Sequence, residues 1–221
     1  MLRDEWIWID RNPLLHDGSM SEPSGHPYST LELYRFVTQD VRIEEETLAP
    51  ELLHFGECAT ARFRWSGDTE IAHRHAIHAT ILRALSYDYS NTDLPQTPQQ
   101  YNVISYPRFL SGDADHRGLK YALYHGPYSP SRGTDTRNHL GETEAWLAQL
   151  LGVVMIQSPT NPYSITGNAT ACVDELEFRE WTTDGYAGWF GPGREWWGTF
   201  LWTIAWPAHG ILVGITASST D

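Results

Sequence analysis

Lysine is nearly absent from the sequence: Lys120 is the single lysine, and every other basic residue is an arginine. The chain carries 15 basic and 28 acidic residues, which give it a formal net charge of −13. No run of basic residues occurs, whereas binding to the phosphates of DNA or RNA requires a basic face. We therefore expect no sequence-specific binding of nucleic acid.

The low lysine content, the retained arginines and the acidic surplus favour a halophilic source. In molar salt the Debye length is only ~3 Å, so repulsion among acidic residues costs little there. A GC-rich genome and an ordinary acidic protein remain the alternatives. The length of 221 residues is sufficient for a substantial core without disulfides or metals.

Motifs for metal, nucleotide and covalent chemistry are also missing. The two cysteines, Cys58 and Cys172, are far apart and form no CxxC, so a zinc site and a thioredoxin-like site lack their signature. We expect both to be buried free thiols, with a disulfide as the alternative. The sequence contains no HExxH, GxxxxGK[ST], GxSxG or GxGxxG, and we expect no cofactor.

Long apolar runs are absent as well. The first residues carry charges where a signal peptide needs an apolar stretch, which argues against export by that route. The most apolar segment, 198–215, is interrupted by Pro207, His209 and Gly210 and alternates with a period of two residues. We expect neither a transmembrane helix nor membrane insertion.

Alternating hydrophobicity predicts a strand-dominated chain. A strand over 60–65 and a C-terminal hairpin over 199–216, turning at 207–210, carry the clearest patterns. Further candidate strands cover 5–9, 31–38, 101–106, 119–125, 152–157 and 174–181. Helices are predicted over 69–85, capped by Asp68 or Thr69, and over 141–151, which has acidic residues in its first turn.

These elements predict an α+β fold with a twisted antiparallel or mixed sheet and the two main helices packed on one face. No repeat or obvious linker divides the chain, so we expect a single domain over 1–221. Segments rich in Pro, Gly, Ser, Asn and Thr predict long ordered loops at 12–29, 90–100, 126–136 and 158–168.

Three histidines, His73, His75 and His78, fall within six positions of the predicted helix over 69–85. At about 100° per residue, His75 and His78 lie at the edge of the apolar face, and His73 points into solvent. A pair at i and i+3 could bind one metal ion, but no further ligand is identifiable in the sequence. We expect hydrogen-bonded histidines at the edge of the core, with a metal site at His75 and His78 as the alternative.

Two acidic segments and a glycosylation sequon have simpler interpretations. The segment 112–118 resembles the start of a calcium loop, but Arg117 and Tyr124 occupy positions that need carboxylates, so we expect an acidic turn. The run 43–47 is expected to be a solvated charged surface. Asn168 begins an Asn-Ala-Thr sequon in a predicted loop, although the sequence indicates no secretion.

Ten tryptophans are many for this length, and they are concentrated near the two ends of the chain. The aromatic segment 181–206 has three interpretations: core side chains, a subunit interface, or a platform for stacked sugars or bases. The predicted interface residues are Trp189, Phe190, Trp196, Trp197, Trp202 and Trp206.

With no catalytic motif identified, we expect a structural assembly component and not an enzyme. The most specific form of this expectation is a virion protein at the neck, tail or baseplate of a tailed virus, with a halophilic archaeon as one possible host. Its partners would be other copies of itself and neighbouring structural proteins, in the virion or, before assembly, in the cytoplasm. The alternatives are a metal- or His-dependent enzyme using His75 and His78, and a module binding a small ligand or carbohydrate through the C-terminal tryptophans.

Overall fold

The computed structural model describes residues 35–55, 58–85, 100–125, 139–153, 155–157, 170–186, 190 and 198–218. The main sheet contains β1 (Arg35–Val37), β2 (Val41–Glu46), β3 (His54–Phe55), β4 (Cys58–Gly67), β5 (Tyr101–Ile104), β8 (Glu177–Trp181), β9 (Thr199–Trp206) and β10 (Ile211–Ser218). The helices are α1 (Pro50–Leu53), α2 (Thr69–Leu85), α3 (Tyr106–Ser111), α4 (Leu119–Tyr124) and α5 (His139–Leu151). A separate parallel pair is formed by β6 (Met155–Gln157) and β7 (Thr170–Cys172), and 3-10 turns cover Val173–Glu175, Asp184–Tyr186 and Pro207–His209.

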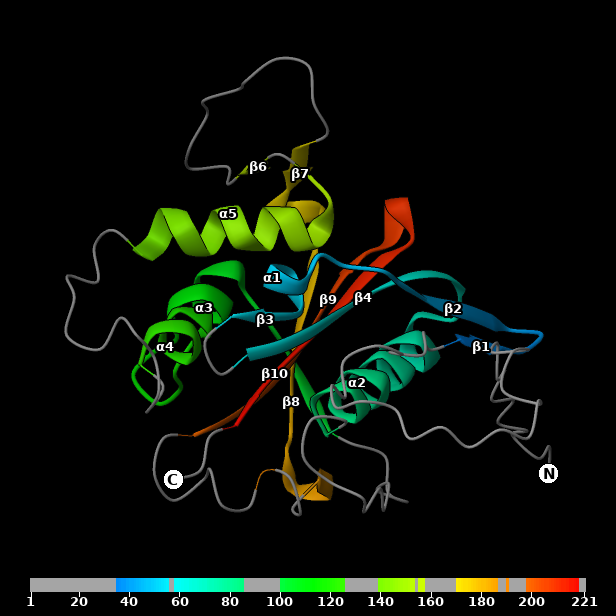
Figure 1. Ribbon diagram of the computed structural model, residues 1–221, viewed down its shortest axis with the longest axis horizontal. Helices are drawn as coiled ribbons and strands as arrows, with labels where there is room; N and C mark the ends of the chain where they lie inside the picture. Colours follow the sequence, from blue (N-terminus) through cyan, green and yellow to red (C-terminus); the bar gives the residue numbers. More distant parts are fainter. Residues whose placement is uncertain are drawn as a thin grey trace, which may run out of the picture.

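The main sheet is antiparallel and open, with the strand order β1-β2-β4-β10-β9-β8-β5 and with β3 paired to one end of β4 (Figure 1). The α+β class and the C-terminal hairpin are confirmed, because β9 and β10 pair from Ile211↔Trp206 to Ser218↔Thr199. This strand order places β1 and β5 at the two ends of the sheet, so among the described strands these two are its edges.

Helices cover both faces of this sheet (Figure 1). α2 packs on one face against alternate residues of β4 and β10, such as Ala61, Phe63 and Leu212. α3, α4 and α5 pack on the opposite face, which carries the other set of β9 and β10 side chains. The prediction that both main helices lie on one face is wrong. β9 is buried along both of its faces, and a strand of that kind needs a covering layer on each side.

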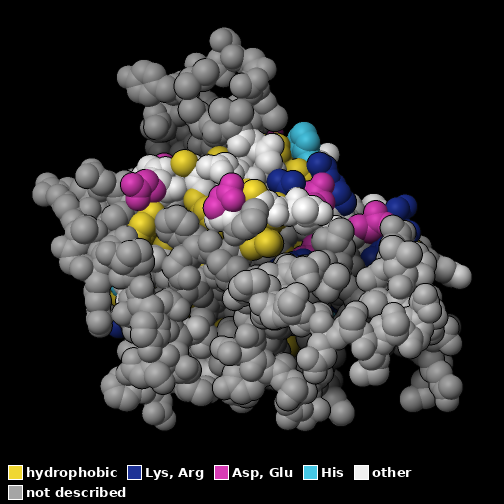
Figure 2. All heavy atoms as spheres, viewed as in Figure 1, with side chains coloured by type: hydrophobic (Ala, Val, Ile, Leu, Met, Phe, Trp, Pro, Cys, Tyr) yellow, Lys and Arg dark blue, Asp and Glu magenta, His cyan; other side chains and the backbone are white. Residues whose placement is uncertain are grey.

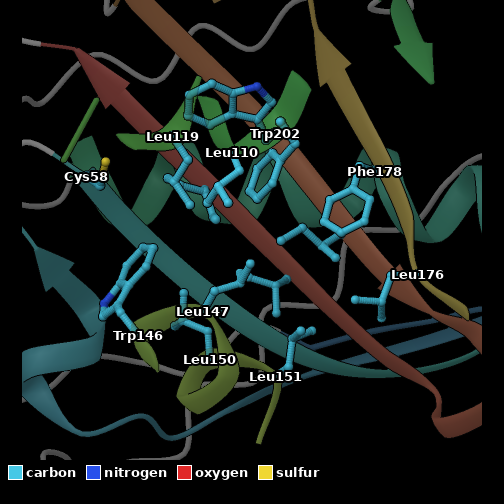
Figure 3. Packing of buried hydrophobic residues seen from close by; sticks show 14 of the residues in the cluster. Cys58, Leu110, Leu119, Trp146, Leu147, Leu150, Leu151, Leu176, Phe178 and Trp202 are labelled. Atoms are coloured by element: carbon cyan, nitrogen blue, oxygen red, sulfur yellow. The ribbon is translucent and has the colours of Figure 1, made fainter. Parts of the chain in front are cut away.

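The larger core lies between the sheet and α5. Leu147, Leu150 and Leu151 of α5 point towards Phe178 of β8 and Trp202 of β9, and none of these side chains is more than 2% exposed (Figure 3). Burying one such side chain contributes roughly 1.5–3 kcal/mol. This layer therefore holds the central strands in place.

The opposite layer is thinner because α2 approaches β10 closely. A Cβ atom built at Gly214 would lie 2.0 Å from the hydroxyl oxygen of Thr80, so only glycine fits beneath the helix. The Thr80 hydroxyl donates to the carbonyl of Ala76, 2.7 Å away. At the start of α2 the side chain of Asp68 accepts from the N–H of Ile71, which confirms the predicted N-cap. Small residues thus form the stripe of α2 that faces the sheet.

Several local predictions need correction. Of the segment 119–125, predicted as a strand, residues 119–124 form α4, because Leu119, Ala122 and Leu123 are buried at helical spacing. The run 43–47 is not merely a solvated surface: Glu45 is buried and pairs with Arg83 of α2. The acidic segment 112–118 does form a turn, closed by hydrogen bonds to the Asp113 side chain.

Other predictions fall outside the described residues: the strand over 5–9, the loops at 12–29, 126–136 and 158–168, residues 90–99 of the remaining loop, and the sequon at Asn168. Within the described ranges, none of the helices has the length and apolar character needed to cross a membrane.

Candidate functional site at the β5 edge

The three histidines of α2 are distributed differently from the prediction. His73 is fully buried and faces the sheet, so the expectation that it lies in solvent is wrong. The reason is the close approach at Gly214, which turns the stripe containing His73, Ala76 and Thr80 towards β10 and β9. Besides His73, the stripe next to Gly214 contains the small residues Ala76 and Thr80, which contribute little to an apolar periodicity.

His75 and His78 lie away from that stripe. The ring of His75 stacks on Phe36 of β1, with the ring centroids 3.5 Å apart. Burial, together with repulsion from His75, lowers the pKa of His78 to about 4, so His78 is neutral at physiological pH. Among the described residues, no group of three or more His, Cys, Asp or Glu side chains is arranged to hold a metal ion. The alternative of a metal site at His75 and His78 therefore gains no third ligand from this part of the chain.

The predicted aromatic interface divides into two parts. Trp189, Trp196 and Trp197 lie outside the described residues. Phe190, Trp202 and Trp206 are interior, with at most 2% of each exposed, so they are core side chains and not the contact surface assigned to them. Trp202 stacks on Phe200, and the indole N–H of Trp206 donates to Glu175, 3.2 Å away. Both tryptophans belong to β9, a central strand covered by helices, which explains their burial.

The two cysteines also occupy different environments. Cys58 is buried, Cys172 is partly exposed, and both are free thiols. The expectation of free thiols is confirmed, whereas the expected burial holds for Cys58 alone.

A charged cluster that the sequence did not predict lies where α2 meets β8 and β5. At its centre is Arg179 of β8, whose side chain is 7% exposed and pairs with Glu70 of α2 and with Glu177 of β8. Burial alone would lower the pKa of Arg179, but its hydrogen bonds to Glu177 and Glu70 outweigh that effect and raise it. Arg74 adds a second cation to Glu70 at 2.7 Å. The cluster is therefore internally paired.

This cluster also holds the edge strand. The guanidinium of Arg179 lies over the ring of Tyr101 in β5, 4.2 Å from its centroid. Burial raises the pKa of Glu70, but hydrogen bonds from Arg179, Tyr101 and Arg74 more than offset this and leave the pKa below its usual value. The Tyr101 ring also contacts Trp181 of β8 at 4.8 Å. Tyr101 is thus fixed by a cation, a carboxylate and an indole.

His73 lies at the bottom of the cluster. Its Nδ1 is 2.6 Å from the hydroxyl of Thr203, which also accepts the indole N–H of Trp181 at 2.8 Å. Its Nε2 is buried without a hydrogen-bond partner among the described residues and is 3.9 Å from a carboxylate oxygen of Glu177. Burial, followed by the charge of Arg179, lowers the pKa of His73 to about 3. Thr203 is fully buried in the sheet, so this Thr–His–Glu arrangement supports packing and not a nucleophile.

On its outer side, β5 pairs with no other strand among the described residues. The N–H of Thr182 donates to the carbonyl of Gln100, which makes these opposite residues a hydrogen-bonded pair in the ladder. Because such pairs alternate in an antiparallel ladder, Tyr101 and Val103 direct their backbone N–H and C=O groups away from β8. The side chain of Val103 is 65% exposed, the largest fraction among the exposed large hydrophobic residues described.

The charges on the opposite face of the same edge are also paired. Arg108 of α3 contacts Glu180 of β8 at 2.9 Å, beside Asn102 in the ladder. The strand itself, Tyr-Asn-Val-Ile, contains no charged residue. Edge strands are normally protected by charge, proline or a bulge, and β5 has none of these within its four residues. The edge is thus uncharged and supported from beneath, with the neighbouring described charges paired within the chain.

Sequence reasoning recognised β5 as a strand but not as an edge, since the edge position depends on the order of strands in the sheet. Comparison with known proteins adds no further assignment: no family model, curated protein or solved structure matches this chain.

Proposed function

We propose that this protein is a structural component of a multi-subunit assembly and acts through protein–protein contacts instead of catalysis. The observation that carries the proposal is the β5 edge, where Val103 combines a mostly exposed apolar side chain with outward-facing backbone groups. Such an edge is a template for adding a strand from another chain.

The more specific form of the proposal is a virion protein at the neck, tail or baseplate of a tailed virus. A net charge of −13 keeps such a protein from adhering to DNA that passes nearby, because the charges are alike. In molar salt the same charge opposes contact between copies only weakly. A halophilic host would fit both properties.

The proposal is tested by measuring the mass of the full-length protein in solution by gel filtration with light scattering. The measurement covers a concentration series at low salt and at molar salt. We expect association that strengthens with protein concentration and with salt, because screening reduces repulsion between acidic copies. A compact monomer at every concentration and salt contradicts the proposal.

The variant that locates the contact is Val103→Lys. A lysine at this exposed position leaves the fold intact but introduces a charge into the edge, and we expect association to weaken about tenfold or more. The matched control is Val37→Lys in β1, which places the same charge on the 52% exposed valine of the opposite edge. Equal weakening of association by both variants would show that the contact is not made specifically by β5.

A further inference from the structure

We propose that the partner of β5 is β5 of a second copy, paired antiparallel across a twofold axis that passes beside Asn102. This inference rests on the proposed function and specifies its contact. The two sheets would then join into one continuous sheet through a self-complementary edge.

The register follows from which residues face outward. In the ladder with β8, Tyr101 and Val103 are the residues whose backbone groups point away from β8. If Asn102 faces Asn102 of the second copy, Tyr101 lies opposite Val103 of the second copy. Val103 then lies opposite Tyr101 of the second copy. Each N–H of these two residues then donates to a carbonyl of the other strand. The outward groups match without a gap.

The side chains are also compatible in this register. Tyr101 and Val103 lie on the α2 face of the sheet, as do their ladder partners Trp181 and Arg179. Pairing therefore places a tyrosine beside a valine on one face, an aromatic–β-branched pair that stabilises sheets. On the other face two asparagines meet, and asparagine amides donate and accept equally well.

The described charges beside β5 are paired locally and are compatible with an identical chain at this edge. Beside β5, Arg179 is held by Glu70 and Glu177, and Glu180 is held by Arg108. A second copy brings the same internally paired groups, so no uncompensated charge approaches the edge. A strongly basic or acidic peptide would find no uncompensated opposite charge there.

The contact is small. Stable specific interfaces bury about 1,200–2,000 Å² in total, and pairing of two four-residue strands provides only part of that area. We therefore expect a dimer that dissociates on dilution and is strengthened by salt, because each copy carries a net charge of −13.

The experiment is intermolecular disulfide formation in full-length protein carrying Cys172→Ser, so that the partly exposed native thiol is absent. Asn102→Cys faces itself across the axis at about 4.5 Å between Cα atoms, which lies within the range that a disulfide spans. We expect mild oxidation to convert most of the protein to a covalent dimer. The matched control, Gln100→Cys, lies about 14 Å from its counterpart in this register and is not expected to cross-link.

The outcomes separate the two proposals. Cross-linking of Asn102→Cys but not of Gln100→Cys, lost when Val103→Lys is added, supports the β5 pairing. Association of the wild type without cross-linking at position 102 overturns this inference while leaving the proposed assembly function intact. A wild type that stays monomeric and shows no cross-link overturns both. Equal cross-linking at both positions indicates random collision and overturns the register.

Discussion

The two edges of the sheet end in similar strands but carry their charges in different places. At β1 the charges lie at the surface: Arg35 and Arg42 both contact Glu44 at 2.8–2.9 Å, and all three are at least partly exposed. Figure 2 shows dark blue and magenta side chains gathered over the end of the molecule where β1 and β2 lie in Figure 1. At β5 the central cation, Arg179, is buried beneath the strand.

This difference separates two uses of an ion pair. Around β1, solvated charges surround the exposed Val37 and make the addition of another strand unfavourable. Around β5, the charges are turned inwards and fix Tyr101, while Val103 stays uncharged and accessible. The β1 edge is thus protected, and the β5 edge is supported without being protected. Three substitution experiments test this contrast.

The largest effect is expected from Arg179→Ala. Removing the buried cation leaves Glu177 without its arginine, leaves Glu70 paired with Arg74 alone, and withdraws the contact with Tyr101. Removing one partner of a buried ion pair lowers the free energy of unfolding by about 3–5 kcal/mol. Because both glutamates are partly exposed, we expect a loss of stability near the lower value. The measurement is the free energy of unfolding from urea titration monitored by tryptophan fluorescence.

A triple variant controls for the unpaired carboxylates. Arg179→Met combined with Glu70→Gln and Glu177→Gln removes the charges together, and we expect it to recover much of the lost stability. If Arg179→Ala lowers the free energy of unfolding by less than about 1 kcal/mol, the cluster does not hold the β5 edge.

The contrast between the edges shows what could be read from the sequence. The strand patterns of β4, β9 and β10 were evident because their side chains alternate, and the cap at Asp68 marked the start of α2. These signals are local. They establish the fold class and the C-terminal hairpin.

Relations between distant segments were not readable in the same way. Arg83 and Glu45 are 38 residues apart, and Arg179 and Glu70 are 109 apart, so neither pair produces a pattern within a window of sequence. His73 was misplaced because the packed stripe of α2 is built of alanine and threonine, which contribute little to apolar periodicity. The short segment of α4 fitted helical and strand spacing equally well.

A smaller effect is expected from acid. His73 is neutral when folded, with its pKa lowered to about 3, whereas in the unfolded chain it takes up a proton near pH 6.5. Between these values the unfolded state binds the proton and the folded state does not, so stability falls as pH is lowered through this window. Each such histidine contributes a slope of up to about 1.4 kcal/mol per pH unit.

The substitution His73→Gln removes this titration while keeping a group that can bond to Thr203. We expect its free energy of unfolding to depend less steeply on pH between about 6 and 4.5 than that of the wild type. His78, whose pKa is lowered to about 4, contributes in the same direction, as does Glu70 with its lowered pKa, so part of the slope remains. An identical slope in His73→Gln and the wild type would show that His73 is not buried in its neutral form.

The smallest effect is expected from Arg42→Ala beside β1. Arg42 is 55% exposed and pairs with a Glu44 that Arg35 also contacts, so its removal leaves the carboxylate compensated. Exposed pairs contribute ~0–1 kcal/mol, and we expect less than about 0.5 kcal/mol here, disappearing in molar salt. Both variants are measured by the same urea titration. The comparison shows whether the exposed charges at β1 contribute less to the free energy of unfolding than the buried charge at β5. A loss comparable to that of Arg179→Ala would mean that both edges depend on their ion pairs for folding, and the contrast between them would then lie in Val103 and the uncharged strand alone.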